Sequence, residues 1–169
     1  RILMKQSADT IKKVSLELGG NAPLIILDDA DIDSAGRETR ASKFRNAGQT
    51  CVCASRVFVQ AGIYDDFAAA LTEKVAAMSV GNGADDGVVT GPLIDRQGLE
   101  KVERHVADAG AKGAEVRTGG SAHSLGGTFF EPTVLTGMTS EMQVFGEETF
   151  GPVAPLFKFE TEAEVVAMA

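Results

Sequence analysis

Residues 44–53 (FRNAGQTCVC) contain both cysteines of the chain, and the first of them has the setting of a reactive thiol. Cys51 follows a small, polar Gly-Gln-Thr turn and precedes an apolar run, so its thiol can face a cleft while its backbone is held rigidly. The thiolate is the nucleophilic form of cysteine, and exposed backbone N–H groups on a turn can lower its pKa and stabilise a developing oxyanion. Cys51 is therefore the candidate nucleophile.

A thiol nucleophile needs a general base, and Glu17 is the best placed carboxylate. It lies between Leu16 and Leu18 and precedes two glycines. Apolar surroundings are therefore expected to raise the pKa of Glu17 toward neutrality and to suit it to take a proton from water or from a thiol. A structural ion pair at the end of a strand explains the same pattern, and composition and position alone favour that alternative.

The elements that must position these residues follow from the hydrophobic patterns of the chain. Apolar residues that recur every three or four positions predict helices, and short apolar or alternating runs between turn residues predict strands. The repeated order of strand and helix predicts a layered α/β fold with a largely parallel sheet and flanking helices. The expected strands are residues 14–18, 23–27, 52–60, 114–118, 129–135 and 153–159, and the expected helices are residues 28–46, 63–75, 99–113 and 162–169, with the end of another helix in residues 1–13.

Composition limits the classes of partner. The chain has 169 residues, of which 44% are hydrophobic and 24% charged, and this fits one globular domain. A net charge of −8 disfavours nucleic acid or an anionic membrane as the main partner. No apolar run has the length of a membrane span, so a cytoplasmic location is the default prediction. Two cysteines separated by one residue do not indicate the disulfide framework of a secreted protein.

Metal and phosphate sites are not predicted within the chain. His105 and His123 are the only histidines, and both are expected to be solvated at the surface, which leaves a Cys/His metal site or Cys-His dyad poorly supported. The sequence contains neither a Gly-x-Gly-x-x-Gly turn after a strand nor a Gly-x-x-x-x-Gly-Lys-Ser/Thr loop. Any nucleotide site must therefore be shared with other residues.

Three motifs resemble those of the aldehyde dehydrogenase superfamily. They are LELGGNAP at 16–23, FRNAGQTC at 44–51 and EETFGP at 147–152, which are similar in order and spacing to the glutamate, cysteine and cofactor-contact motifs of that superfamily. Within it, KFRN at 43–46 and TCVC at 50–53 are most similar to the succinate-semialdehyde dehydrogenases. The motifs of the glutarate-semialdehyde dehydrogenases are nearly as similar.

The resemblance implies a role for each matching residue. Cys51 would attack an aldehyde carbonyl to form a thiohemiacetal, its backbone N–H would hold part of the oxyanion, and hydride transfer to NAD or NADP would leave a thioester. Glu17 would activate the water that hydrolyses this thioester. Glu148 would bind the nicotinamide ribose, Phe150 would pack near the nicotinamide, and Leu18 would offer its backbone carbonyl to the carboxamide.

Four further residues have expected roles. Arg45 lies six residues before Cys51, and its planar guanidinium suits the distant carboxylate of a four-carbon substrate, as the resemblance to semialdehyde dehydrogenases implies; a surface ion pair is the alternative. Lys43 and Glu147 are expected to be solvated. Cys53 either begins a strand as a small hydrophobic residue or, as in some succinate-semialdehyde dehydrogenases, forms a reversible disulfide with Cys51 that switches the enzyme off.

The resemblance also implies how the chain is divided. Residues 1–18 correspond to the end of the cofactor-binding domain and the crossover, and residues 19–169 to the catalytic domain, incomplete at its C-terminal end. The expected whole enzyme is a cytoplasmic homo-oligomer, a dimer or tetramer, that acts on a small aldehyde, and the isolated chain is expected to be inactive. NAD and NADP, and succinate and glutarate semialdehyde, all stay candidates. A cofactor-free thiol hydrolase and a non-catalytic assembly module are the alternatives from other classes.

Overall fold

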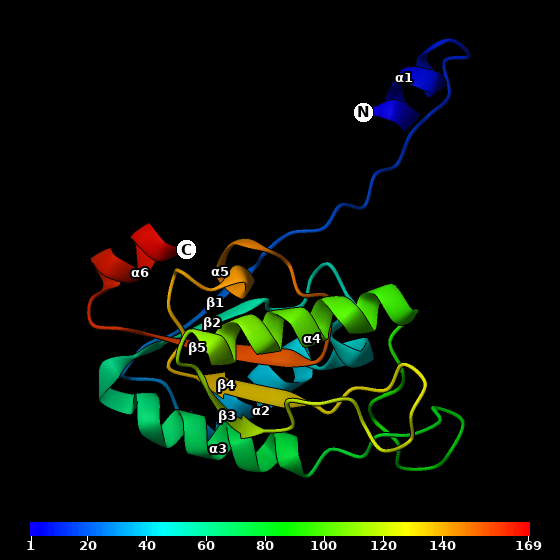
Figure 1. The fold of residues 1–169 in the computed structure, drawn as a ribbon. Coiled ribbons are helices and arrows are strands. Elements are labelled where there is room, and N and C mark those ends of the chain that lie inside the picture. Colours follow the sequence, from blue (N-terminus) through cyan, green and yellow to red (C-terminus); the bar gives the residue numbers. More distant parts are fainter.

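A computed structural model describes residues 1–169 and contains one sheet of five strands in the order β1-β2-β5-β4-β3 (Figure 1). The strands β1 (Pro23–Ile26), β2 (Arg56–Gln60), β5 (Val153–Phe159) and β4 (Thr133–Thr136) are parallel. The edge strand β3 (Glu115–Thr118) pairs antiparallel with β4. The predicted α/β fold with a largely parallel sheet is therefore confirmed.

Helices cover both faces of this sheet. Helices α2 (Ile32–Lys43) and α3 (Tyr64–Ala76) pack together on one face, while α4 (Arg96–Ala111) and the short α5 (Gln143–Gly146) lie over the other (Figure 1). Helix α6 (Glu162–Met168) follows β5, and α1 (Ile2–Ala8) stands away from the sheet on an extended linker. Two 3-10 turns, η1 (Arg45–Gly48) and η2 (Ala61–Ile63), follow α2 and β2.

Three of the helices begin at side chains that cap their first backbone N–H groups. The carboxylate of Asp31 accepts from Ser34 N at 2.8 Å at the start of α2, and that of Asp95 accepts from Gly98 N at 2.7 Å at the start of α4. Short polar side chains at this position satisfy N–H groups that have no partner within the helix. The predicted helix start at the Asp28–Asp31 cluster is thus realised at its last aspartate.

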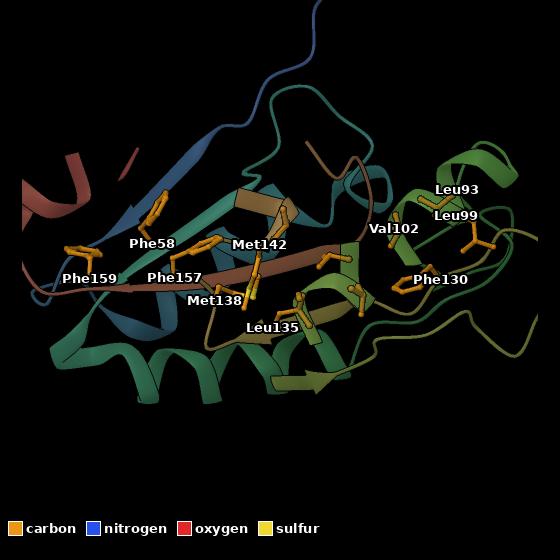
Figure 2. Close-up of a cluster of buried hydrophobic side chains, with 14 of the residues drawn as sticks. Phe58, Leu93, Leu99, Val102, Phe130, Leu135, Met138, Met142, Phe157 and Phe159 are labelled. Carbon is orange, nitrogen blue, oxygen red and sulfur yellow. The ribbon is translucent and has the colours of Figure 1, made fainter. Parts of the chain in front are cut away.

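Each face of the sheet has its own hydrophobic core, because neighbouring residues of a strand point to opposite faces. Val57 and Val59 of β2 belong to the core with α3, whereas Phe58 between them belongs to the core on the α4 side and packs against Phe157 and Phe145. On the α4 side, Phe58, Phe157 and Phe159 gather at one end of the core, as Figure 2 shows, with Leu99, Val102 and Phe130 at the other. The nearly continuous apolar runs of β2 and β5 follow from burial on both faces.

Three predicted strands need correction. Residues 14–18 form no strand: the segment is exposed and pairs with no other, and alternating residues need a partner strand to form one. The strand predicted at 52–60 begins only at Arg56, because Cys53 N donates to Thr50 O at 2.9 Å and closes a turn. The strand predicted at 129–135 begins after Pro132, which has no N–H to donate.

None of the helices combines the length and the apolar character that a membrane span requires. No group of three or more His, Cys, Asp and Glu side chains is arranged to hold a metal ion.

Candidate active site

The three chemical motifs meet because each precedes a parallel strand. Glu17 lies before β1, Cys51 before β2 and Glu148 before β5. Parallel neighbours begin at the same edge of a sheet, so the segments that enter them converge there. The amino edge of the sheet is therefore where the candidate residues gather.

A pocket of about 900 Å³ opens at this edge. It is lined by residues of all three motifs and by the first turns of α4. The lining includes Glu17, Leu18, Cys51, Glu148 and Phe150, five of the residues that the sequence singled out. Arg45 and Cys53 do not line it.

The turn before Cys51 has an unusual backbone. Asn46, Ala47 and Gly48 are consecutive residues in the left-handed region, with φ of 50°, 55° and 73°. Side chains other than glycine adopt this region at a cost, so the surrounding structure must hold the turn in place. Gln49 supplies part of that hold, since its Oε1 accepts from Ile94 N at 2.9 Å and its Nε2 donates to Pro92 O at 3.3 Å.

Cys51 is half-buried, and its sulfur is free. Its backbone N–H donates to no acceptor in the chain. A free N–H next to a nucleophilic sulfur has the geometry of an oxyanion donor, because the oxygen of a carbonyl attacked by that sulfur develops close to it.

The turn of Cys51 also touches the segment that carries Glu148. A Cβ atom added at Gly48 would lie 2.0 Å from Gly151 O, so only glycine permits this approach of the two backbones. Gly151 in turn abuts Val102 of α4, whose Cγ2 would lie 2.3 Å from an added Cβ. Two glycines therefore let the two motif loops and α4 pack directly on one another.

Glu148 and Glu17 have different surroundings. Glu148 is half-buried, its Oε1 accepts from Gly20 N at 3.3 Å, and its carboxylate fills the place that a side chain at Gly19 would take. Glu17 is exposed, and its neighbours Leu16 and Leu18 are 45% and 72% exposed. The predicted apolar surroundings of Glu17 are therefore absent from this chain, because residues 14–18 are all exposed.

Arg45 and Cys53 lie outside the pocket for different reasons. Arg45 is exposed and forms no ion pair, which leaves its guanidinium free for a ligand. Cys53 is buried within a turn rather than at the start of a strand, and its thiol lies 3.8 Å from Arg45 O. Both cysteines are free thiols.

Two residues predicted to be solvated are buried. Lys43, the last residue of α2, is 1% exposed, and burial lowers the pKa of its ammonium to about 8, although Cys53 and Glu148 nearby partly oppose this. His105 is also 1% exposed, and burial lowers its pKa below the usual 6.5, with a hydrogen bond to Glu147 opposing the shift. His123 is partly exposed, and Glu147 is exposed as predicted.

Comparison with known proteins shows the family of the chain. The model of the aldehyde dehydrogenase family matches residues 1–169. The chain belongs to the aldehyde dehydrogenase family.

The names of several similar members of this family specify a semialdehyde as substrate. The chain is 58% identical over 169 residues to the succinate-semialdehyde dehydrogenase of Escherichia coli (strain K12) whose name specifies NADP(+), and 57% identical over 169 residues to the glutarate-semialdehyde dehydrogenase of Pseudomonas aeruginosa. It superposes on a crystal structure of succinate-semialdehyde dehydrogenase from Burkholderia pseudomallei with a TM-score of 0.95 at 56% identity over 99% of the chain. In each case the chain spans about 35% of the length of the relative, although the relatives cover essentially all of the chain.

Aldehyde dehydrogenases use NAD or NADP, and the pocket fits one end of such a molecule. The Glu148 carboxylate, which approaches the linker only because residue 19 is glycine, offers acceptor oxygens suited to ribose hydroxyls. Phe150, 39% exposed at the pocket and left-handed with φ 54°, offers an aromatic surface for a planar ring. The residues present therefore fit the nicotinamide nucleoside end.

The sequence did not identify the part of the pocket that α4 provides. Its apolar residues Leu99 and Val102 face the core, and the opposite face brings polar and charged side chains to the pocket. The amphipathic pattern predicts that this face is polar, but it carries no signal that the face borders the site. The α4 residues at the pocket are Gln97, Gly98, Glu100, Lys101 and Arg104, with Asp95 at the cap.

Proposed function

We propose that this chain provides the nucleophile and the hydrolytic base of an NAD(P)-dependent aldehyde dehydrogenase. The observation that carries the proposal is the single pocket at the amino edge of the sheet. Three loops that are distant in sequence bring Cys51, Glu17, Glu148 and Phe150 to its wall. A thiol, a carboxylate open to water and a nucleoside-binding pair are the groups that thiol-dependent aldehyde oxidation requires.

The first step belongs to Cys51. Its thiolate sulfur forms a bond to the aldehyde carbon while the π electrons of the carbonyl move to oxygen, giving a thiohemiacetal. The unpaired N–H of Cys51 lies beside the new oxyanion and donates to it. The pronounced left-handed turn at residues 46–48 fixes the direction from which the sulfur attacks.

The second step belongs to Glu17. Glu148, Phe150 and the backbone carbonyl of Leu18 would hold a nicotinamide, which when bound would supply the hydride acceptor for oxidation of the thiohemiacetal to a thioester on Cys51. The Glu17 carboxylate then takes a proton from water as the water oxygen bonds to the thioester carbon, and the carbon–sulfur bond breaks to release the acid and the Cys51 thiolate. Exposure of Glu17 to solvent gives it ready access to that water.

Succinate semialdehyde is the substrate that we propose. Arg45 carries a guanidinium without an ion-pair partner close in sequence to Cys51, and a carboxylate at the far end of the substrate would neutralise it. Glutarate semialdehyde is the second candidate, because the sequence identity to a glutarate-semialdehyde dehydrogenase is 57%, close to the 58% identity to a succinate-semialdehyde dehydrogenase. Assembly as a homo-oligomer stays a prediction from the family.

The test uses the full-length protein that contains this chain. NAD(P)H formation is followed with succinate semialdehyde, glutarate semialdehyde and a neutral aldehyde of the same length. We expect the succinate compound to give the highest kcat/KM and Arg45→Leu to lower it about 100-fold for both semialdehydes but little for the neutral aldehyde, as loss of a charge-assisted contact predicts. Equal rates for charged and neutral substrates in the unmodified protein would contradict the substrate proposal.

Two variants separate the chemical roles. Cys51→Ala should abolish NAD(P)H formation, whereas Glu17→Gln should release a single burst of NAD(P)H, about one per site, followed by turnover about 100-fold slower, because the thioester forms and is not hydrolysed. Hydrolysis of an activated ester by the same variants, with and without NAD(P)+, separates this proposal from a cofactor-free thiol hydrolase. A protein that hydrolyses esters and never reduces NAD(P)+ would be such a hydrolase.

A further inference from the structure

His105 lies on α4 and is buried, yet both of its ring nitrogens have partners. Nδ1 lies 3.0 Å from Thr149 Oγ1, and Nε2 lies 3.3 Å from Glu147 Oε2. The two partners flank Glu148 in the segment that enters β5. One side chain of α4 therefore contacts the residues on either side of the candidate nucleoside-binding carboxylate.

One tautomer of the neutral ring satisfies all three groups. A carboxylate only accepts hydrogen bonds, so Nε2 carries the proton and donates to Glu147. Nδ1 is then an acceptor, and the hydroxyl of Thr149 donates to it. Burial lowers the pKa of His105, which is consistent with this neutral ring. The result is a chain of two directed hydrogen bonds from Thr149 through His105 to Glu147.

The backbone of residues 148–150 makes no hydrogen bonds of its own. Glu147 N donates to Gln143 O at 2.9 Å and Gly151 O accepts from Val153 N at 2.9 Å, but no backbone group of residues 148–150 forms a hydrogen bond within the chain. A segment without backbone hydrogen bonds is held by its side chains or moves freely. Phe150 at its end is left-handed, a conformation that persists only where the surroundings impose it.

Alternation along the segment links this hold to the site. Glu147 is extended, with φ −117° and ψ 132°, so successive side chains point in opposite directions. Glu147 and Thr149 turn toward His105, while Glu148 between them turns to Gly19 and Gly20 at the pocket. Fixing the outer two residues against α4 thereby fixes the direction of the middle one.

We propose that His105 is a positioning residue, which holds Glu147 and Thr149 against α4 so that Glu148 and Phe150 keep the orientation needed to bind the nicotinamide nucleoside. This inference rests on the proposed function, since it takes that nucleoside as the ligand of Glu148 and Phe150. His105 itself does not line the pocket, so we expect it to contact neither substrate nor cofactor. Its effect passes entirely through the segment that it holds.

The test compares His105→Leu with the full-length wild-type protein. Leucine has nearly the volume of histidine and no hydrogen-bonding atoms, so the core stays filled while both contacts are lost. We expect the Kd and KM for NAD(P)+ to rise about tenfold, equivalent to about 1.4 kcal/mol, while ester hydrolysis by Cys51 without cofactor stays within about twofold. His123→Leu is the matched control, because His123 lies in a surface loop away from the pocket, and it should leave all three values unchanged.

A second pair of variants tests the same contact from the other side. Thr149→Val keeps the shape of the side chain and removes the donor to Nδ1, whereas Thr149→Ser keeps the hydroxyl. We expect Thr149→Val to raise the Kd for NAD(P)+ about threefold to tenfold and Thr149→Ser to restore affinity to within about twofold of wild type. If Thr149 acted only through packing, Thr149→Val would keep the wild-type affinity for NAD(P)+ because it keeps the shape, and that result would overturn the proposal even if His105→Leu failed to fold.

A third measurement does not depend on the cofactor. A protease specific for glutamate cleaves after Glu147 or Glu148 only when the segment leaves its place. We expect cleavage there to be about tenfold faster in His105→Leu than in wild type at equal fold stability. Unchanged cleavage together with unchanged affinity for NAD(P)+ would overturn the proposal. A wild-type protein that binds no NAD(P)+ would instead overturn the proposed function, and the cleavage rates would still decide whether His105 holds the segment.

Discussion

Lys43 shows how a single residue can depart from its usual setting. A lysine in the last turn of a helix normally reaches water and complements the helix dipole, which is why solvation was the natural expectation. Here the turn η1 lies close against the end of α2, and a Cβ atom added at Gly48 would lie 3.2 Å from the backbone oxygen of Lys43. Lys43 is 1% exposed and its ammonium forms no ion pair, so burial lowers its pKa from 10.5 to about 8.

We expect Lys43→Met to stabilise the protein at pH 7. A pKa lowered from 10.5 to about 8 corresponds to about 3 kcal/mol of unfavourable free energy for the charged form in the folded state. Because the folded pKa lies below the unfolded pKa, this penalty is complete below about pH 8 and fades as the pH rises toward 10.5. Urea unfolding at pH 7 and pH 10 measures the difference between variant and wild type.

The control for this prediction is Lys13→Met, at an exposed lysine without an ion pair. It should change stability by less than about 0.5 kcal/mol at either pH. A gain from Lys43→Met of the same size at pH 7 and pH 10 would show that packing rather than charge is responsible. A loss at both would show that the ammonium has a stabilising partner.

The two cysteines should differ strongly in reactivity. Cys51 is half-buried at the pocket, whereas Cys53 is 2% exposed, so iodoacetamide at neutral pH should label Cys51 first and Cys53 about tenfold or more slowly. Intact-mass and peptide analysis measure the order. The disulfide switch stays a prediction, and peroxide followed by dithiothreitol tests it: if Cys53→Ala is inactivated and rescued just like wild type, Cys53 takes no part.

At the scale of elements, the site depends on close backbone contacts that side-chain patterns do not reveal. The start of α2 after an aspartate, the buried face of α3 and the run of β5 were predictable, because each rests on local composition or periodicity. The three left-handed residues of η1 were not, since only Gly48 among them favours that conformation. Residues 14–18 do not form a strand, although apolar and polar residues alternate there. Such alternation favours a strand, but the strand forms only where a neighbouring strand pairs with it, and none does here.

We expect Gly48→Ala to damage both stability and activity. Alanine at φ 73° is strained, and its Cβ would lie 2.0 Å from Gly151 O, so the turn of Cys51 and the segment of Glu148 must separate. The expected cost is about 3 kcal/mol or more of unfolding free energy, with a loss of kcat/KM because the sulfur is displaced. Urea unfolding and steady-state kinetics measure the two effects.

Gly110→Ala is the matched control for this prediction. Gly110 lies within α4, and an added Cβ there has nothing within 4 Å. The same chemical change should therefore stabilise the protein by about 0.5–1 kcal/mol, as alanine does for glycine inside a helix. Equal effects at the two positions would show that the contact between Gly48 and Gly151 does not constrain the site.

At the scale of the whole molecule, the candidate site is a product of topology. The sequence could identify Cys51, Glu17 and Glu148 because they stand in recognisable motifs, and a parallel sheet explains why three such loops converge. The sequence could not predict that His105 is buried. A polar residue on an amphipathic helix faces either solvent or a neighbouring loop, and the loop that covers His105 lies more than 40 residues away in the chain. The contribution of α4 to the pocket was missed for the same reason.

The 169-residue chain, expressed alone, is expected to produce no measurable NAD(P)H from succinate semialdehyde. It spans about 35% of the length of its relatives, and its residues fit only the nicotinamide nucleoside end of the cofactor, with no recognisable phosphate-binding loop. Glu17 also lies on residues 14–18, an exposed segment that pairs with no strand of the sheet. We therefore expect the chain alone to bind the cofactor weakly and to align Glu17 poorly, which together would remove much of the rate even with the Cys51 thiol in place. Absorbance at 340 nm with the chain and with the full-length protein at equal concentration tests this, and NAD(P)H from the chain alone would show that residues 1–169 suffice to hold the cofactor.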